Sequence, residues 1–192
     1  LTESMLYLSK TIRHLGRVDH GDAFLDYNSQ ERDRGITIFS KQAIFNWNDC
    51  QITLIDTPGH VDFSTEMERT LQVLDCAILV ISGIDGIQNH SETIWKLLKH
   101  YHVPTFIFIN KMDSIYANKD KLLNDLKDQF DENCFDFENL DENFYETIAL
   151  NNEKLLDYYL EHQTLTKEMI TDEIYQRNLF PCFFGSALKI EG

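Results

Sequence analysis

A continuous apolar run from Cys76 to Ser82 constrains the fold more than any other stretch of this sequence. A strand without polar alternation needs cover on both faces, as in the parallel sheets of α/β proteins, so the run predicts a central parallel strand. Apolar residues at helical spacing predict a helix over Gln88–Tyr101, and a second apolar strand follows at Phe106–Ile109. This alternation of strand, helix and strand predicts an α/β fold with a doubly wound, mostly parallel sheet.

An antiparallel hairpin is predicted at the edge of that sheet. Ala43, Phe45 and Trp47 alternate with polar residues, and the turn signal Asn48-Asp49 separates them from a second strand, Gln51–Asp56. Apolar residues at helical spacing follow that strand and predict a helix after a short loop.

Three of the predicted strands end in residues that suit a ligand. The strand Gln51–Asp56 ends in Asp56 and runs into Thr57-Pro58-Gly59-His60. Phe106–Ile109 runs into Asn110-Lys111-Met112-Asp113, and an apolar strand at Phe183-Phe184 runs into Gly185-Ser186-Ala187. In open α/β sheets, ligands bind at the carboxyl ends of the strands, so Asp56 can hold a metal-bound water while the Gly59 amide faces an anion. Each segment by itself also fits an ordinary polar turn, but the three together indicate a binding site.

With Arg34-Gly35-Ile36-Thr37-Ile38 upstream, these segments resemble the GTP-binding domain of the translational GTPases, the elongation factor G group. The order and spacing of four motifs is far more specific than any one of them. The resemblance spans nearly the whole chain and is strongest over Glu31–Asp113 and Leu179–Ala187. It implies a P-loop NTPase-like fold with helices on both faces of the sheet, GTP as substrate and Mg²⁺ as cofactor.

The resemblance assigns roles on the phosphate side of the site. Thr37 would place its hydroxyl and carbonyl at Mg²⁺ and the γ-phosphate, and Asp56 would hold the ion through water. His60 would be the catalytic residue, because it matches the histidine that orients the attacking water in this subgroup. The polar segment Gly16–Arg34 would be switch I, and Ile36 one side of an apolar gate beside His60. A lone histidine is otherwise more often structural, and a metal-binding pair in His60-Val61-Asp62 would lack a third ligand.

The segments after the other two strands match the family's guanine-binding motifs. Asp113 can accept hydrogen bonds from N1–H and the 2-amino group of guanine, while Asn110 bonds the opposite edge and Lys111 packs over the ring. Adenine offers no matching pair of donors, so it would leave the carboxylate desolvated and unpaired. The complete set of predicted GTP-binding residues is Thr37, Asp56, Thr57, Pro58, Gly59, His60, Asn110, Lys111, Met112, Asp113, Ser186 and Ala187.

The resemblance implies that residues 1–192 form one GTP-binding domain, truncated at its N-terminus. In the family, a phosphate-binding loop precedes the helix predicted at the start of this chain, and none of the 192 residues matches that loop. It would either lie before Leu1 or be missing from a remnant domain. Residues 114–180 form an acidic segment that looks like a reduced helical insert, with helices predicted at Lys121–Phe130, Asn152–His162 and Thr166–Arg177. Residues 131–146 show no clear period.

Charge and cysteine content limit the partners and the compartment. The formal charge is −15, from 32 acidic and 17 basic residues, so an extended nucleic-acid-binding face on this domain is not expected. The four cysteines show no metal-binding spacing and are expected to be reduced thiols. No apolar run approaches the length of a membrane span. We therefore expect a soluble, cytoplasmic protein with no membrane partner.

The predicted function is that of the GTPase domain of a ribosome-dependent translation factor, whose partners would be GTP, GDP and the GTPase-activating region of the large ribosomal subunit, including the stalk protein. The short insert and the segment Glu31–Ile38 look most like the tetracycline-resistance ribosomal protection proteins. An elongation factor G or a release-factor relative is the first alternative. A non-hydrolysing nucleotide-binding or interaction module is an alternative of a different class.

Overall fold

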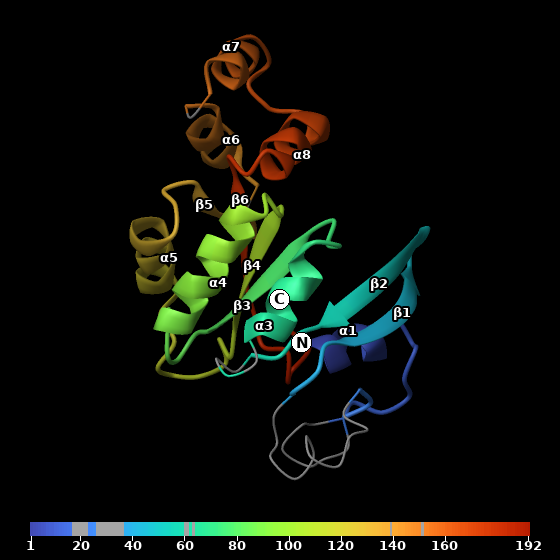
Figure 1. Cartoon of the computed structure of the whole chain (residues 1–192). Coiled ribbons are helices and arrows are strands. Elements are labelled where there is room, and N and C mark those ends of the chain that lie inside the picture. Colours follow the sequence, from blue (N-terminus) through green and yellow to red (C-terminus); the bar gives the residue numbers. More distant parts are fainter. Residues whose placement is uncertain (17–22, 26–36, 60–61, 63, 139, 151) are drawn as a thin grey trace. The chain divides into compact units, whose positions relative to one another are not determined.

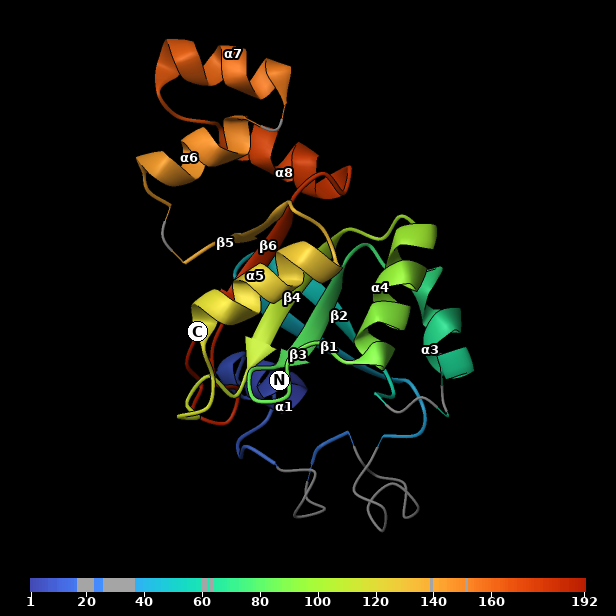
Figure 2. The ribbon, with the colours of Figure 1, turned by 90° about the vertical axis from the view of Figure 1, so that its left-hand side faces the viewer.

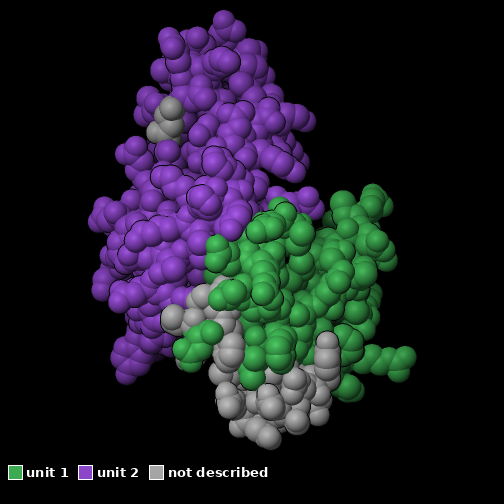
Figure 3. All heavy atoms as spheres, in the orientation of Figure 1, with its two compact units in different colours: residues 1–74, 187–190 green, residues 75–186, 191–192 purple. Residues whose placement is uncertain are grey.

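The computed structural model describes the chain except for residues 17–22, 26–36, 60–61, 63, 139 and 151 (Figure 1). Most of the predicted switch I segment, together with Ile36 and His60, therefore lies outside the described residues. The chain divides into two compact units, one of residues 1–74 and 187–190 and the other of residues 75–186 and 191–192 (Figure 3). The elements have the α/β character predicted from the sequence.

The first unit contains the predicted antiparallel hairpin. Strand β1 (Lys41–Trp47) pairs with β2 (Cys50–Asp56) in a register that places Lys41 opposite Asp56 and Trp47 opposite Cys50. Asn48 in the turn has a φ of 50°, a left-handed conformation that asparagine tolerates better than most residues. In the described residues the hairpin is a two-stranded sheet of its own.

The inner face of the hairpin carries the core of the first unit. Helix α1 (Thr2–Leu8) contributes Leu6, which is fully buried, and helix α3 (Ser64–Leu71) follows the hairpin. The alternating side chains of β1 that point inward make the burial pattern predicted for a half-covered strand. The buried cluster consists of Leu6, Ile12, Leu25, Ala43 and Phe45, with Met5, Ile52 and Leu54 packed against it.

The second unit is built on a parallel four-stranded sheet. Its strands are β3 (Ala77–Ser82), β4 (Thr105–Asn110), β5 (Cys134–Asp136) and β6 (Phe180–Phe184), in the spatial order β3-β4-β6-β5. The sequence predicts a central position for the strand at Cys76–Ser82, but among the described residues β3 is an outer strand of this sheet. Leu79 and Ile81 on one face of β3 are buried, whereas Ile78 and Val80 on the other face are exposed, so within this unit only one of the two faces expected to be covered is covered.

Helices α4 (Asn89–His100) and α5 (Lys119–Gln129) pack beside each other in this unit (Figure 2). Trp95 of α4 stacks on Phe130, at the end of α5, with ring centroids 4.8 Å apart, and meets Phe180 of β6 edge-on at 4.7 Å. Arg177 lies over Trp95 and Phe180 and donates a hydrogen bond to Thr105 Oγ1. These contacts connect the helical layer to the middle of the sheet.

The acidic segment begins with α5, where a helix was predicted, and after β5 it continues as three helices that gather next to the start of β6 (Figures 1 and 2). They are α6 (Glu142–Ala149), α7 (Glu153–His162) and α8 (Lys167–Tyr175), and the helix predictions near α7 and α8 are confirmed. The sequence pattern did not predict β5 or α6, which lie in or begin within the segment without a clear period. These elements bury Phe135, Phe144 and Ile148 in a shared core, so tertiary packing stabilises what local periodicity does not indicate.

None of the helices in the described part of the chain is long and apolar enough to cross a membrane.

Candidate functional site

The second unit brings two of the predicted binding segments together. Strands β4 and β6 are neighbours, and the residues that follow them remain hydrogen-bonded beyond the last strand pair. The Gly185 amide donates to Ile109 O at 2.9 Å, and the Met112 amide donates to Gly185 O at 3.0 Å. The segment Asn110–Asp113 is therefore joined directly to the segment that begins at Gly185.

The loop after β4 is a tight turn that leaves two of its charged side chains accessible. The Lys111 amide donates to Asn110 Oδ1 at 2.9 Å, and Lys111 has a φ of 67°, in the left-handed region. The Ser114 amide then donates to Lys111 O at 3.1 Å. Asn110 and Met112 are partly buried, while Lys111 and Asp113 are exposed. This turn therefore presents a carboxylate and an ammonium to solvent at the end of a buried strand.

Ser186 lies in the second of the two joined segments and is 2% exposed. Its amide donates to Glu191 O at 2.8 Å, and its carbonyl accepts from the Glu191 amide at 3.1 Å. These two bonds fix the backbone of a loop that contains no regular helix or strand.

Gly185 is needed for this arrangement, although it was not among the predicted binding residues. A Cβ at this position would overlap the backbone oxygen of Glu191 and lie 2.9 Å from Gly192 Cα. Backbone atoms cannot swing aside as side chains do, so a larger residue is excluded without moving the loop. A glycine directly after an apolar strand was the available sequence signal.

The remaining predicted residues that the structure describes belong to the first unit. Asp56 is the last residue of β2 and is partly buried. Thr57 is partly buried, Pro58 is buried and Gly59 is exposed, with nothing within 4 Å of the place where a Cβ would stand. The open space around Gly59 leaves its backbone approachable, as the anion-binding prediction requires.

Ala187 and Thr37 are the other two predicted binding residues in the first unit. Ala187 is buried, and its carbonyl accepts a hydrogen bond from Ser4 Oγ at 2.6 Å, which ties it to α1. Thr37 is partly buried and lies shortly before Lys41, the ladder partner of Asp56. Thr37 and Asp56 are therefore associated with the same end of the hairpin.

The donor set of Thr37 and Asp56 fits Mg²⁺. This ion prefers hard oxygen ligands and is usually held by one or two protein oxygens, with phosphate oxygens and water completing the octahedron. No group of three or more acidic, histidine or cysteine side chains that could hold a metal ion occurs among the residues that the structure describes. A site with few protein ligands, completed by a nucleotide, is the arrangement that these residues suit.

Comparison with known proteins decides the family. The elongation factor Tu GTP binding domain family matches residues 1–192, the whole length of the chain. The chain belongs to this family. The prediction of a translational GTPase domain is therefore confirmed.

Two curated proteins with similar sequences come from two groups of translation-related proteins. Tetracycline resistance protein TetP of Clostridium perfringens is 50% identical over 127 residues, which cover 66% of this chain and 20% of the relative. Elongation factor G 2 of Borreliella burgdorferi is 45% identical over 129 residues, covering 67% of this chain and 19% of the relative. The chain thus spans about a fifth of the length of these curated relatives.

A solved structure agrees with the fold of the GTPase domain. A crystal structure of a protein from Thermus thermophilus superimposes with a TM-score of 0.86 and covers 98% of this chain and 35% of that one. Because the sequences are 21% identical, this similarity supports the fold alone. The predicted fold class is confirmed.

Proposed function

We propose that the chain acts as the GTP-binding and GTP-hydrolysing domain of a ribosome-dependent translation factor. The observation that carries this proposal is the direct joining of Asn110–Asp113 to Gly185–Ser186 at the ends of β4 and β6, in a chain whose whole length matches a GTP-binding family. These are the two segments that guanine recognition requires to be close together.

The chemistry of the loop after β4 suits guanine. The exposed carboxylate of Asp113 accepts from N1–H and the 2-amino group, and the Asn110 amide bonds the opposite edge of the base. Lys111 covers the ring with its apolar stem. Adenine lacks the donor pair, so it leaves a charged acceptor unpaired and is rejected. Ser186 and Ala187, which match the family's last base-contacting motif, are included among the residues that bind the base.

Hydrolysis is assigned to the residues around Asp56. Thr57, Pro58 and Gly59 form the turn that carries the Gly59 amide toward the γ-phosphate, and His60 orients a water molecule for in-line attack. Thr37, and Asp56 through water, would hold Mg²⁺, which would supply positive charge next to the phosphates. The protein residues therefore contribute positioning and electrostatic stabilisation rather than covalent chemistry.

The partner is the ribosome, at the GTPase-activating region of the large subunit, and the compartment is the cytoplasm. Similarity to TetP and to an elongation factor G is the basis for this part of the proposal. We assign the closer functional relationship to the tetracycline-resistance proteins, in which GTP hydrolysis would change the conformation of the factor and release it from the ribosome. Residues 1–192 would act as a single nucleotide-binding domain with a short acidic insert at 114–180.

The test is Mg²⁺-dependent GTP turnover by the full-length protein, with and without ribosomes. We expect turnover that ribosomes accelerate and that His60→Ala lowers by about 10²-fold or more while GDP binding is kept, since a water-orienting residue acts in the transition state. GDP binding without turnover in any of these conditions would instead identify a nucleotide-binding module. A protein that binds neither GDP nor GTP refutes the proposal.

A further inference from the structure

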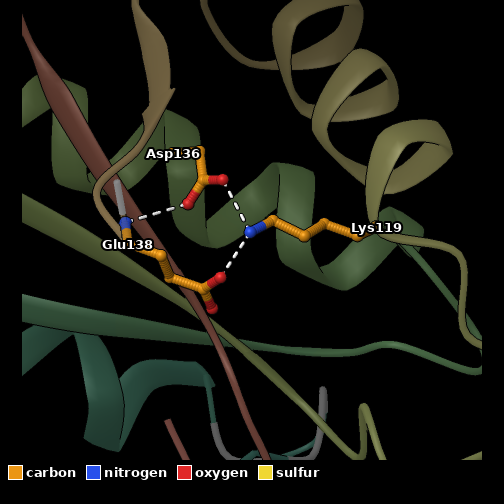
Figure 4. A network of polar contacts seen from close by, with 3 residues as sticks. All are labelled: Lys119, Asp136 and Glu138. Atoms are coloured by element: carbon orange, nitrogen blue, oxygen red, sulfur yellow. Dashed lines mark hydrogen bonds and ion pairs between the residues drawn. The ribbon is translucent and has the colours of Figure 1, made fainter. Parts of the chain in front are cut away.

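Lys119, the first residue of α5, makes a three-membered polar network with residues at the end of β5 (Figure 4). Its Nζ lies 2.6 Å from Asp136 Oδ2 and also donates a hydrogen bond to Glu138 Oε2. Asp136 Oδ1 in turn accepts from the Glu138 amide at 3.0 Å. The Asp136 carboxylate is therefore held by the Glu138 backbone as well as by the ammonium group, which also binds the Glu138 carboxylate.

The same ammonium group faces an aromatic ring on β6. Lys119 Nζ is 4.7 Å from the centroid of Phe184, a side chain that is 5% exposed. A cation above an aromatic face is attracted by the ring quadrupole, more strongly where water is partly excluded. Because Phe184 directly precedes Gly185, this contact acts on the last residue before the loop that holds Ser186.

Lys119 consequently connects both segments of the proposed base site. On one side it begins the helix that ends the loop from Asn110, and the helix start is capped by Asn118, whose Oδ1 accepts from the Lys121 amide at 2.9 Å. On the other side it contacts the end of β6 through Phe184 and the neighbouring β5 through Asp136. The Met112–Gly185 hydrogen bond joins the same two segments.

We propose that Lys119 is a positioning residue for guanine recognition, which holds the loop after β4 and the loop after β6 in register through Asp136, Glu138 and Phe184. This inference rests on the proposed function, because it presumes that these two loops bind the base. Lys119 acts through the loops and does not contact the nucleotide. A simple surface ion pair would affect only stability, whereas a positioning role changes the discrimination between bases.

The test compares GDP with IDP, whose base lacks the 2-amino group, in the full-length protein with Mg²⁺. In Lys119→Met, we expect the Kd for GDP to rise about threefold to tenfold, the range expected from loss of a partly exposed ion pair and a cation–π contact. The Kd for IDP should rise less than about twofold. Lys119→Arg keeps the charge and should restore most of the GDP preference. Equal weakening for both nucleotides, or no weakening, overturns the proposal.

Two further variants separate this role from general stability. Lys96→Met removes an exposed helical ion pair with Glu92, 3.7 Å apart, and should leave both Kd values unchanged. Glu138→Gln keeps the Lys119–Asp136 contact, so it gives a smaller but equally selective loss if Lys119→Met fails to fold. An effect of Lys96→Met equal to that of Lys119→Met overturns the positioning role. An unaltered protein that does not prefer GDP to IDP overturns the proposed function, and with it the role of Lys119.

Discussion

Replacing Gly185 with alanine tests whether close packing of backbone against backbone holds the proposed base-binding loop. The added Cβ would overlap Glu191 O. It would also lie 2.9 Å from Gly192 Cα and 3.0 Å from Glu191 C. All three of these atoms belong to the main chain, so the loop itself must move. That movement acts directly on the hydrogen bonds from the Gly185 amide to Ile109 O and from the Met112 amide to Gly185 O.

The size of the effect follows from comparison with Gly83, which lies beside the same loop. A Cβ at Gly83 would meet Met112 Sδ at 2.9 Å and Asn110 O at 3.1 Å. The nearest atom is the far end of a flexible side chain, and methionine adapts readily, so we expect Gly83→Ala to cost less than about 1 kcal/mol. Gly185→Ala should cost about 2–3 kcal/mol, because overpacking against backbone has no cheap relaxation.

The assay is thermal unfolding of the two variants of the 192-residue chain, together with GDP binding by the full-length protein. For a chain of this size, 1 kcal/mol shifts Tm by about 2–4 °C, so Gly185→Ala should lower Tm by about 4–12 °C. Its Kd for GDP should rise at least about tenfold, since one factor of ten corresponds to about 1.4 kcal/mol. If Gly185→Ala were no more harmful than Gly83→Ala in either measurement, the packing argument would be wrong.

Three further predictions address the base site, the lysine network and the buried thiols. Asp113→Asn replaces an acceptor with a donor, so GTP should bind at least about 30-fold more weakly. XTP should bind more tightly than before, because its C2 carbonyl accepts from the new amide. Unchanged GTP affinity would contradict the assignment of Asp113 as the acceptor for guanine. Burial lowers the pKa of Lys119, but hydrogen bonds to two carboxylates outweigh this effect and raise it overall. A raised pKa means that the Lys119 contribution is complete below the unfolded value of about 10.4 and is lost as pH rises through the folded value. The stability difference between the unaltered chain and Lys119→Met should therefore be constant from pH 7 to about pH 10 and shrink above it, and a difference that shrinks below about pH 9 would refute this account. A hydrogen bond with Cys134, together with burial, raises the pKa of Cys182, so a thiol reagent should modify the exposed cysteines in the native chain and reach these two only after unfolding. Rapid native modification of all cysteines would contradict the buried arrangement.

Local pattern in the sequence was sufficient for the elements that carry their own signal. The alternation in β1, the turn at Asn48-Asp49 and the helical spacing in α4 each arise from neighbours in the chain, and each element occurs where it was predicted. The binding segments were also recognisable, since their polar residues follow apolar strands in a fixed order. What the sequence determined was therefore the kind of each long element, the family and the identity of the candidate base-binding residues.

Tertiary structure alone decided the contacts between distant segments. Strand β5 has only three residues, too few for a periodic signal, and it exists because it pairs with β6. No local pattern relates Lys119 to Asp136, Glu138 and Phe184. These four residues come from α5, the end of β5 and β6, and they meet only when β5 lies beside β6. The physical reason is distance along the sequence. Hydrophobic periodicity depends only on residues that are close together in the chain, while ion pairs and close backbone packing depend on which strands the folded chain places side by side.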